Sequence, residues 1–159
     1  MRTALLLVWL VLTGCSPSRI GVREGQQAPD FKALGLDGSP QGMAQLRGKP
    51  AVVVFWASWC GACMAEVPHL QELTRAYGDR VGLLGVNLGE DPRLVQSTVA
   101  ARGLTWPIAL DLDQSLASRF SVRAIPLVLV LDAAGGIRYR GGGLPRQPTV
   151  LLDRLLTEG

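Results

Sequence analysis

Cys60 and Cys63, separated by two residues, are the side chains of this chain best suited to chemistry. They follow an apolar run, residues 51–57, and come just before a helical pattern, residues 65–77, so we expect them where a strand ends and a helix begins. The partial positive charge of a helix N-terminus stabilises a thiolate and lowers the pKa of a cysteine placed there. Two intervening residues also let the sulfurs close into a disulfide. The pair is therefore predicted to exchange electrons with thiols of another protein.

The alternatives for this pair are two structural cysteines or half of a zinc site. A zinc site needs about four ligands, and the only histidine of the chain, His69, is the one further candidate. At 100° per residue His69 faces away from Cys60 on the helix, which predicts a surface histidine and no Cys–His dyad. We therefore expect no metal and favour redox chemistry.

The N-terminus has the pattern of an export signal. A positive charge at Arg2 precedes a short apolar run, residues 4–12, which is too short for the roughly twenty residues that span a bilayer and fits a secretory signal. Residues 12–15, Leu-Thr-Gly-Cys, resemble the lipobox of bacterial lipoproteins, in which the cysteine is lipidated and becomes the first residue. This resemblance implies that Cys15 is a membrane anchor; the alternative is a plain signal peptide. Ser16, where aspartate would signal inner-membrane retention, favours the outer of two membranes.

Length, charge and cysteine count limit the number of domains, the classes of partner and the number of disulfides. The 159 residues suffice for one domain, which we place at residues 28–159, after a signal peptide (1–14) and a polar tether (15–27). The net charge of +3 is scattered without a basic run, so no nucleic-acid partner is expected, and we expect a monomer. Of three cysteines, Cys15 is assigned to the anchor, which leaves one pair and no disulfide framework.

The periodicity predicts an α/β domain. Apolar runs without alternation are typical of strands buried on both faces, and helix boundaries are indicated by Pro92 and Gly103. Strands are predicted over 30–36, 51–57, 81–87, 127–131 and 137–140, and helices over 65–77, 92–102, 114–120 and 148–156. The order β-α-β-α, then β-β-α, predicts a mixed sheet with helices on both faces.

Several of these stretches resemble the thioredoxin superfamily. The matching residues are the active-site motif 55–63, the helix-kinking Pro68, the cis-proline loop 122–126 and the glycine turn 141–144. The resemblance narrows to the membrane-anchored TlpA-like and ResA-like branch through residues 28–31, 36–38, 46–49 and 85–90. It implies a thioredoxin-like fold with an added N-terminal β-hairpin over roughly residues 28–159.

The resemblance assigns roles to the motif residues. Cys60 is the nucleophile, partly exposed, and Cys63 is the more buried resolving thiol. Glu66 stands three residues after the second cysteine, where the branch places a glutamate, and its carboxyl would take and return the proton of Cys63. The alternative is an ordinary surface glutamate.

A substrate-binding surface follows from the same resemblance. Trp59 covers the active site, Gly61 and Ala62 lie between the cysteines, and Pro126 is expected in cis, so that the Ile125 backbone can hydrogen bond to an extended substrate. An ordinary loop proline before a strand is the alternative for Pro126.

The chain departs from the family in places. Val54 replaces the buried aspartate of cytoplasmic thioredoxins, and the dipeptide between the cysteines is Gly-Ala where Gly-Pro is commoner. Leu127 follows the proline where many members have threonine. The last two departures bear on redox potential and partner choice. Trp56 is expected to pack beneath the site.

The sequence thus predicts an exported, lipid-anchored thiol–disulfide oxidoreductase whose only redox group is its dithiol. The branch implies reduction of disulfides in exported proteins, such as apocytochrome c, with electrons from a membrane thiol transporter. A disulfide oxidase or isomerase is one alternative. A peroxiredoxin is disfavoured because its Pro-x-x-x-Thr-x-x-Cys pattern is absent around Cys60. A Sco-like copper-binding assembly protein is disfavoured because that family spaces its cysteines by three and adds a downstream histidine.

Overall fold

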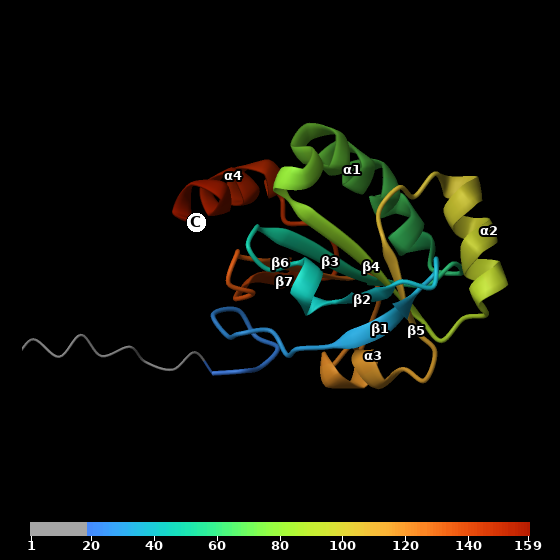
Figure 1. The fold of residues 1–159 in the computed structure, drawn as a ribbon. Coiled ribbons are helices and arrows are strands. Elements are labelled where there is room, and N and C mark those ends of the chain that lie inside the picture. Colours follow the sequence, from blue (N-terminus) through green and yellow to red (C-terminus); the bar gives the residue numbers. More distant parts are fainter. Residues whose placement is uncertain (1–18) are drawn as a thin grey trace, which may run out of the picture.

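The structure, a computed structural model, describes residues 19–159 (Figure 1). The predicted signal peptide, Cys15 and the first part of the predicted tether lie outside the described residues. The strands are β1 (Lys32–Gly35), β2 (Pro40–Gly42), β3 (Ala51–Trp56), β4 (Gly82–Leu88), β5 (Ile108–Asp111), β6 (Leu127–Leu131) and β7 (Ile137–Gly141). The helices are α1 (Gly61–Tyr77), α2 (Pro92–Arg102), α3 (Ser115–Arg119) and α4 (Pro148–Glu158), with single turns η1 (Met43–Gln45) and η2 (Gly78–Arg80).

The strands form one mixed sheet in the order β2-β1-β5-β4-β3-β6-β7. The three central strands β3, β4 and β5 are parallel, whereas β6, β7 and the β1–β2 hairpin pair antiparallel. Every residue of β3 is buried, which explains its unbroken apolar sequence. The predicted thioredoxin-like fold, with a mixed sheet and an N-terminal hairpin, is confirmed.

The two faces of β3 contribute to two separate cores. Val52, Val54 and Trp56 pack in the cluster that includes residues of α1, α2 and α4. Val53 and Phe55 pack in the cluster that includes residues of α3 and η1. Figure 1 shows α1 and α4 on one side of the sheet and α3 on the other. Helices on both faces are therefore confirmed, and the period-two alternation of β3 explains which side chain joins which core.

Strand β5 was not predicted from the sequence, and β2 was expected only as part of the N-terminal hairpin that the resemblance implies. β5 lies between β4, to which it is parallel, and β1, to which it is antiparallel. All four of its residues are buried. The sheet is wider than expected because β5 connects the N-terminal hairpin to the parallel strands.

The described part of the predicted tether is folded against the domain. The N–H groups of Gly25 and Ala28 donate to Ile137 O (2.8 Å) and Gly135 O (3.0 Å), and Ile137 N–H donates to Gln26 O (2.8 Å). Residues 25–28, at the end of the predicted tether and the start of the predicted domain, thus pair with the beginning of the edge strand β7. Such pairing covers backbone groups that an edge strand would otherwise expose. Within residues 19–159, no helix has both the length and the apolar character needed to cross a membrane.

Candidate active site

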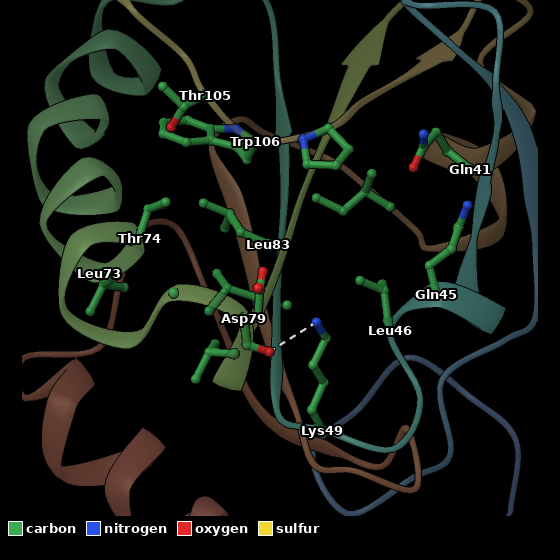
Figure 2. Close-up of a pocket in the computed structure, with 16 residues that line it drawn as sticks. Gln41, Gln45, Leu46, Lys49, Leu73, Thr74, Asp79, Leu83, Thr105 and Trp106 are labelled. Carbon is green, nitrogen blue, oxygen red and sulfur yellow. Dashed lines mark hydrogen bonds between the residues drawn. The ribbon is translucent and has the colours of Figure 1, made fainter.

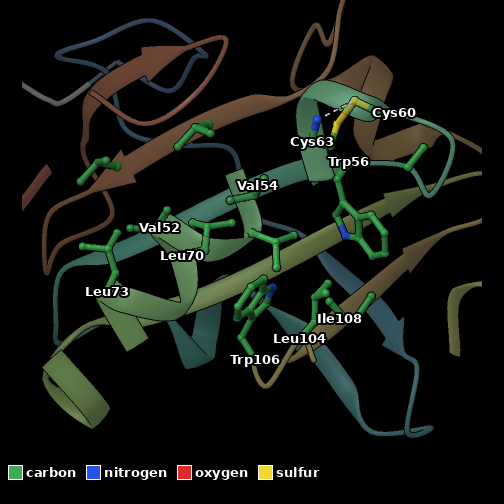
Figure 3. Close-up of a cluster of buried hydrophobic side chains, with 14 of the residues drawn as sticks. Val52, Val54, Trp56, Cys60, Cys63, Leu70, Leu73, Leu104, Trp106 and Ile108 are labelled. Carbon is green, nitrogen blue, oxygen red and sulfur yellow. Dashed lines mark hydrogen bonds between the residues drawn. A yellow bond between two sulfur atoms is a disulfide. The ribbon is translucent and has the colours of Figure 1, made fainter. Parts of the chain in front are cut away.

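Cys60 and Cys63 lie at the junction between the end of β3 and the start of α1. Cys60 occupies the N-cap position with an extended backbone (φ −83°, ψ 100°), and α1 begins at Gly61, earlier than the periodicity from Ala65 predicted. The two sulfurs are joined in a disulfide, with the Cα atoms 5.2 Å apart (Figure 3). The predicted juxtaposition of a strand end, a helix start and two thiols is therefore present.

The start of α1 provides a hydrogen bond to the sulfur of Cys60. The backbone N–H of Cys63 donates to Cys60 Sγ at 3.1 Å, and the helix N-terminus adds its partial positive charge. Both features stabilise negative charge on this sulfur once the disulfide is reduced. This arrangement favours Cys60 as the thiolate that attacks a partner.

Cys60 is less exposed than the sequence predicted. Its exposed fraction is 6% and that of Cys63 is 3%, because the Cys60 side chain turns inward to bond Cys63 and packs in the core cluster under α1. The flanking residues are different: Trp59 is 73% exposed, and Gly61 and Ala62 are exposed as well. A partner would therefore reach Cys60 across this exposed rim.

Trp56 packs beneath the disulfide, as expected from the sequence. It is buried, and with Cys63 and Val54 it lines a cavity large enough for about one water molecule (Figure 3). Its indole N–H has no hydrogen-bond partner among the described residues. The position at which cytoplasmic thioredoxins have an aspartate is filled here by the apolar Val54.

Glu66 lies on the same face of α1 as Cys63, one turn further along. Its side chain is 23% exposed, and its Oε2 accepts a long hydrogen bond from the backbone N–H of Leu144 (3.4 Å) and lies 4.0 Å from His69 Nδ1. The side chain is thus half-buried against another segment and is not fully solvated. His69 itself is 65% exposed, which confirms the predicted surface histidine.

The Ile125–Pro126 peptide bond is cis, as predicted. Pro126 immediately precedes β6, and Leu127 of β6 is paired with Phe55 near the end of β3. The cis-proline loop therefore lies at the same end of the sheet as the cysteines. A substrate-binding role for Ile125 and Pro126 remains a prediction.

Comparison with known proteins agrees with this geometry. A sequence model of the Redoxin family matches residues 23–150. The chain belongs to the Redoxin family. It is 32% identical over 145 residues to the thiol-disulfide oxidoreductase ResA of Geobacillus kaustophilus, covering 87% of this chain and 83% of that protein. It is also 30% identical over 133 residues to the thioredoxin-like protein YneN of Bacillus subtilis, covering 82% and 78%.

Among solved structures, this Redoxin-family chain is similar to a secreted disulfide oxidoreductase of Mycobacterium tuberculosis that is described as homologous to Escherichia coli DsbE. The TM-score is 0.65 at 29% identity, covering 80% of this chain and 95% of the other. The chain is therefore a ResA-like member of the thioredoxin superfamily. With its Cys60–Cys63 pair it is a thiol–disulfide oxidoreductase.

Sequence reasoning missed a polar network behind the active-site loop of this Redoxin-family protein. The carboxylate of Glu90 accepts hydrogen bonds from Ser58 N–H (2.7 Å), Ser58 Oγ (2.5 Å) and Asn87 Nδ2 (2.6 Å). Glu90 is 8% exposed and Asn87 is 1% exposed. A signal was available in the sequence: the polar Asn87 lies near the end of an apolar strand. Because the carboxyl ends of parallel neighbouring strands meet at one edge of the sheet, Asn87 could be expected close to the loop that follows β3.

A separate hollow lies at the opposite end of the sheet. It has a volume of about 330 Å³ and is lined by residues at or just before the starts of β3, β4 and β5, at the end of α1 and in η2, among them Lys49, Asp79 and Trp106 (Figure 2). Lys49 Nζ donates to the backbone carbonyl of Asp79 at 3.0 Å. Because β3 runs from this hollow toward Cys60, the hollow is not part of the redox site of this Redoxin-family chain.

Proposed function

We propose that this protein is an exported, lipid-anchored reductase of protein disulfides. The observation that carries the proposal is the placement of Cys60 at the N-cap of α1, with a backbone N–H on its sulfur. This placement stabilises the thiolate that must attack a substrate disulfide.

In the proposed reaction the reduced protein transfers two electrons to its substrate. The Cys60 thiolate attacks one sulfur of the substrate disulfide, which forms a mixed disulfide and releases a substrate thiolate. Cys63 then gives its proton to the Glu66 carboxylate and attacks Cys60 Sγ. The Cys60–Cys63 disulfide forms, and the second substrate sulfur leaves as a thiolate. The two substrate thiolates take up protons, one of which Glu66 returns.

The dithiol itself is the only redox group that the reaction requires. A donor must then reduce the Cys60–Cys63 disulfide, and a membrane thiol transporter is the donor that we propose. The proposed substrates are disulfides of exported proteins, such as apocytochrome c. A substrate strand would pair with the Ile125 backbone beside Pro126, and would contact Trp59, Gly61 and Ala62.

Export and anchoring rest on the first fifteen residues. We propose that residues 1–14 are removed and that Cys15 carries the lipid, with the outer of two membranes favoured. The description of the similar Mycobacterium tuberculosis protein as secreted supports an extracytoplasmic location. The experiment is to label cells with a radioactive fatty acid: the wild-type chain should carry the label, and a Cys15→Ala chain should not. Equal labelling of both would contradict the anchor.

The direction of electron flow is tested by the reduction potential of the Cys60–Cys63 couple, measured on protein that starts after Cys15. A value near −270 mV, that of thioredoxin, is expected for a reductase. A value near about −120 mV, at the strongly oxidising end of the same scale, would instead assign disulfide formation to the protein.

A further inference from the structure

The loop between β7 and α4 touches the proposed proton carrier of the reaction. Leu144, in this loop, donates its backbone N–H to Glu66 Oε2 at 3.4 Å. The two residues are 78 positions apart in the sequence, so only the fold brings them together. One carboxylate oxygen of Glu66 is thereby directed toward the loop, on the helix face that also carries Cys63.

Gly143 is the second part of this contact. A Cβ built on Gly143 would lie 2.7 Å from Glu66 Oε1 and 3.4 Å from Glu66 Cδ. The first distance is shorter than real Cβ contacts, so any side chain at this position would displace the carboxyl group. The φ angle of Gly143 lies outside the left-handed region, so its backbone conformation does not require glycine. The space that a side chain at position 143 would fill is occupied by the Glu66 carboxyl group.

Tyr139 holds the same loop from β7. Its hydroxyl donates to the backbone carbonyl of Gly143 at 2.9 Å. Burial raises the pKa of Tyr139, and the negative charges of Glu24 and Glu66 raise it further. The hydroxyl therefore keeps its proton at neutral pH and remains a donor, which holds the loop to β7.

The charged surroundings of Glu66 come from three elements. His69 and Glu72 on α1 and Arg146 in the loop line a hollow of about 330 Å³ together with Glu66, and Tyr139 on β7 lies near enough for the charge of Glu66 to raise its pKa. These groups set the electrostatic background of the carboxylate, but none of them restricts its position as Gly143 does. Proton transfer needs a heavy-atom separation of roughly 2.6–3.2 Å, or one bridging water, so position matters.

We propose that Gly143, Leu144 and Tyr139 form a clamp that positions the Glu66 carboxylate for proton exchange with Cys63. The proposal rests on the role given to Glu66 in the proposed function. In this clamp Gly143 provides the space, Leu144 provides the hydrogen bond and Tyr139 fixes the loop. All three are positioning residues, because they act on the reaction through Glu66.

The test compares two adjacent glycines. Gly143→Ala would displace Glu66, whereas a Cβ on Gly142 would meet only Pro126 O at 3.9 Å, an ordinary contact. The readout is the pH profile of the exchange rate between the reduced protein and a small aromatic disulfide, with thermal melting as a check of folding. Glu66→Gln is measured in parallel. A positioned acid or base supplies about 100-fold or more, and we expect Gly143→Ala to lose roughly ten-fold at neutral pH.

The outcomes separate the clamp from the proposed function. The clamp is supported if Gly143→Ala shifts the pH profile in the same direction as Glu66→Gln does. The double variant should show no further shift, and Gly142→Ala should keep the wild-type profile. Tyr139→Phe, which removes one hydroxyl, should shift the profile less and in the same direction. If Glu66→Gln shifts the profile and Gly143→Ala and Tyr139→Phe do not, the clamp is wrong and the role of Glu66 stands. If Glu66→Gln has no effect, both fail.

Discussion

Ser58 donates two hydrogen bonds to Glu90, one from its backbone N–H to Oε2 at 2.7 Å and one from its hydroxyl to Oε1 at 2.5 Å. Ser58 lies two residues before Cys60, in the loop that connects β3 to α1. Glu90 follows β4, the parallel neighbour of β3. The pair thus ties the loop carrying the nucleophile to the next strand of the sheet.

Glu90→Gln should lower both stability and the exchange rate. A glutamine amide has only one acceptor oxygen and would present an NH₂ group to donors of Ser58 or Asn87. A buried donor left without a partner costs about 1–3 kcal/mol, which should be seen as a lower free energy of unfolding in urea. The matched control is Asp91→Asn. Asp91 caps α2 by accepting from Arg93 N–H at 2.8 Å, and asparagine caps equally well. Equal losses in both variants would contradict this role of Glu90.

Tyr77 links the end of α1 to α4 in a manner that depends on pH. Its hydroxyl donates to Asp153 Oδ1 at 2.8 Å, with Thr149 O at 3.2 Å. Burial, followed by the hydrogen bond and charge of Asp153, raises the pKa of Tyr77 from 10.0 to about 12. Because the folded state holds this proton more tightly than the unfolded state does, the resulting stability is complete below pH 10 and is lost as the pH rises through about 12.

Tyr77→Phe should remove that part of the pH dependence. At neutral pH the variant should lose about 0.5–1.5 kcal/mol, the net contribution of a hydrogen bond, because the exposed residues Asp153 and Thr149 lose the Tyr77 donor and turn to water. Between pH 10 and pH 12 the difference in stability between wild type and variant should shrink. Urea unfolding of the oxidised protein across this range measures the difference, in which the titrations common to both proteins cancel. A constant difference would show that Tyr77 does not titrate as described.

The parts of the fold that the sequence predicted are those with a strong local pattern. β3 is an unbroken apolar run, and α2 carries proline at its start and glycine at its end. β5 was missed because Ile108–Asp111 is too short to show a period; it is a strand because β4 and β1 pair with it on both sides. The start of α1 was predicted too late because Gly61 and Ala62 carry no apolar periodicity, whereas Cys60 accepts the capping hydrogen bond.

The candidate site likewise contains features that the sequence predicted and contacts that it did not. The cysteine pair is visible from spacing alone, and the cis-proline loop through resemblance. The contacts Glu66–Gly143 and Ser58–Glu90 join residues far apart in the sequence, so only the fold places them together. The glycine turn 141–144 is visible through the resemblance, but the fold alone shows that Gly143 leaves room for the carboxylate of Glu66.

Gly85 is a position where a side chain would be costly for packing alone. A Cβ there would lie 2.8 Å from Ile108 Cδ1, 2.9 Å from Trp56 Nε1 and 3.3 Å from Trp106 Nε1. Overpacking of this kind costs about 1–3 kcal/mol, so Gly85→Ala should lower the free energy of unfolding by that amount and change the tryptophan fluorescence. Gly142→Ala, whose Cβ is almost free of contacts, is the control. An unchanged Gly85→Ala protein would show that the two indoles can move apart.

The unequal roles of the two cysteines are tested by trapping. Cys60 lies at the N-cap between the exposed residues Trp59 and Gly61, whereas Cys63 is 3% exposed behind it. In Cys63→Ser the second step is blocked, so reduced protein mixed with a disulfide-bonded protein should accumulate a mixed disulfide at Cys60. Cys60→Ser should form almost none, because Cys63 lies inside α1 and its thiol lacks the N-cap position that stabilises a thiolate at Cys60. Mass spectrometry of the alkylated complexes identifies the linked cysteine. Trapping through Cys63 at a comparable rate would reverse the assignment of nucleophile and resolving thiol, and Glu66 would then take the proton of Cys63 before the first step.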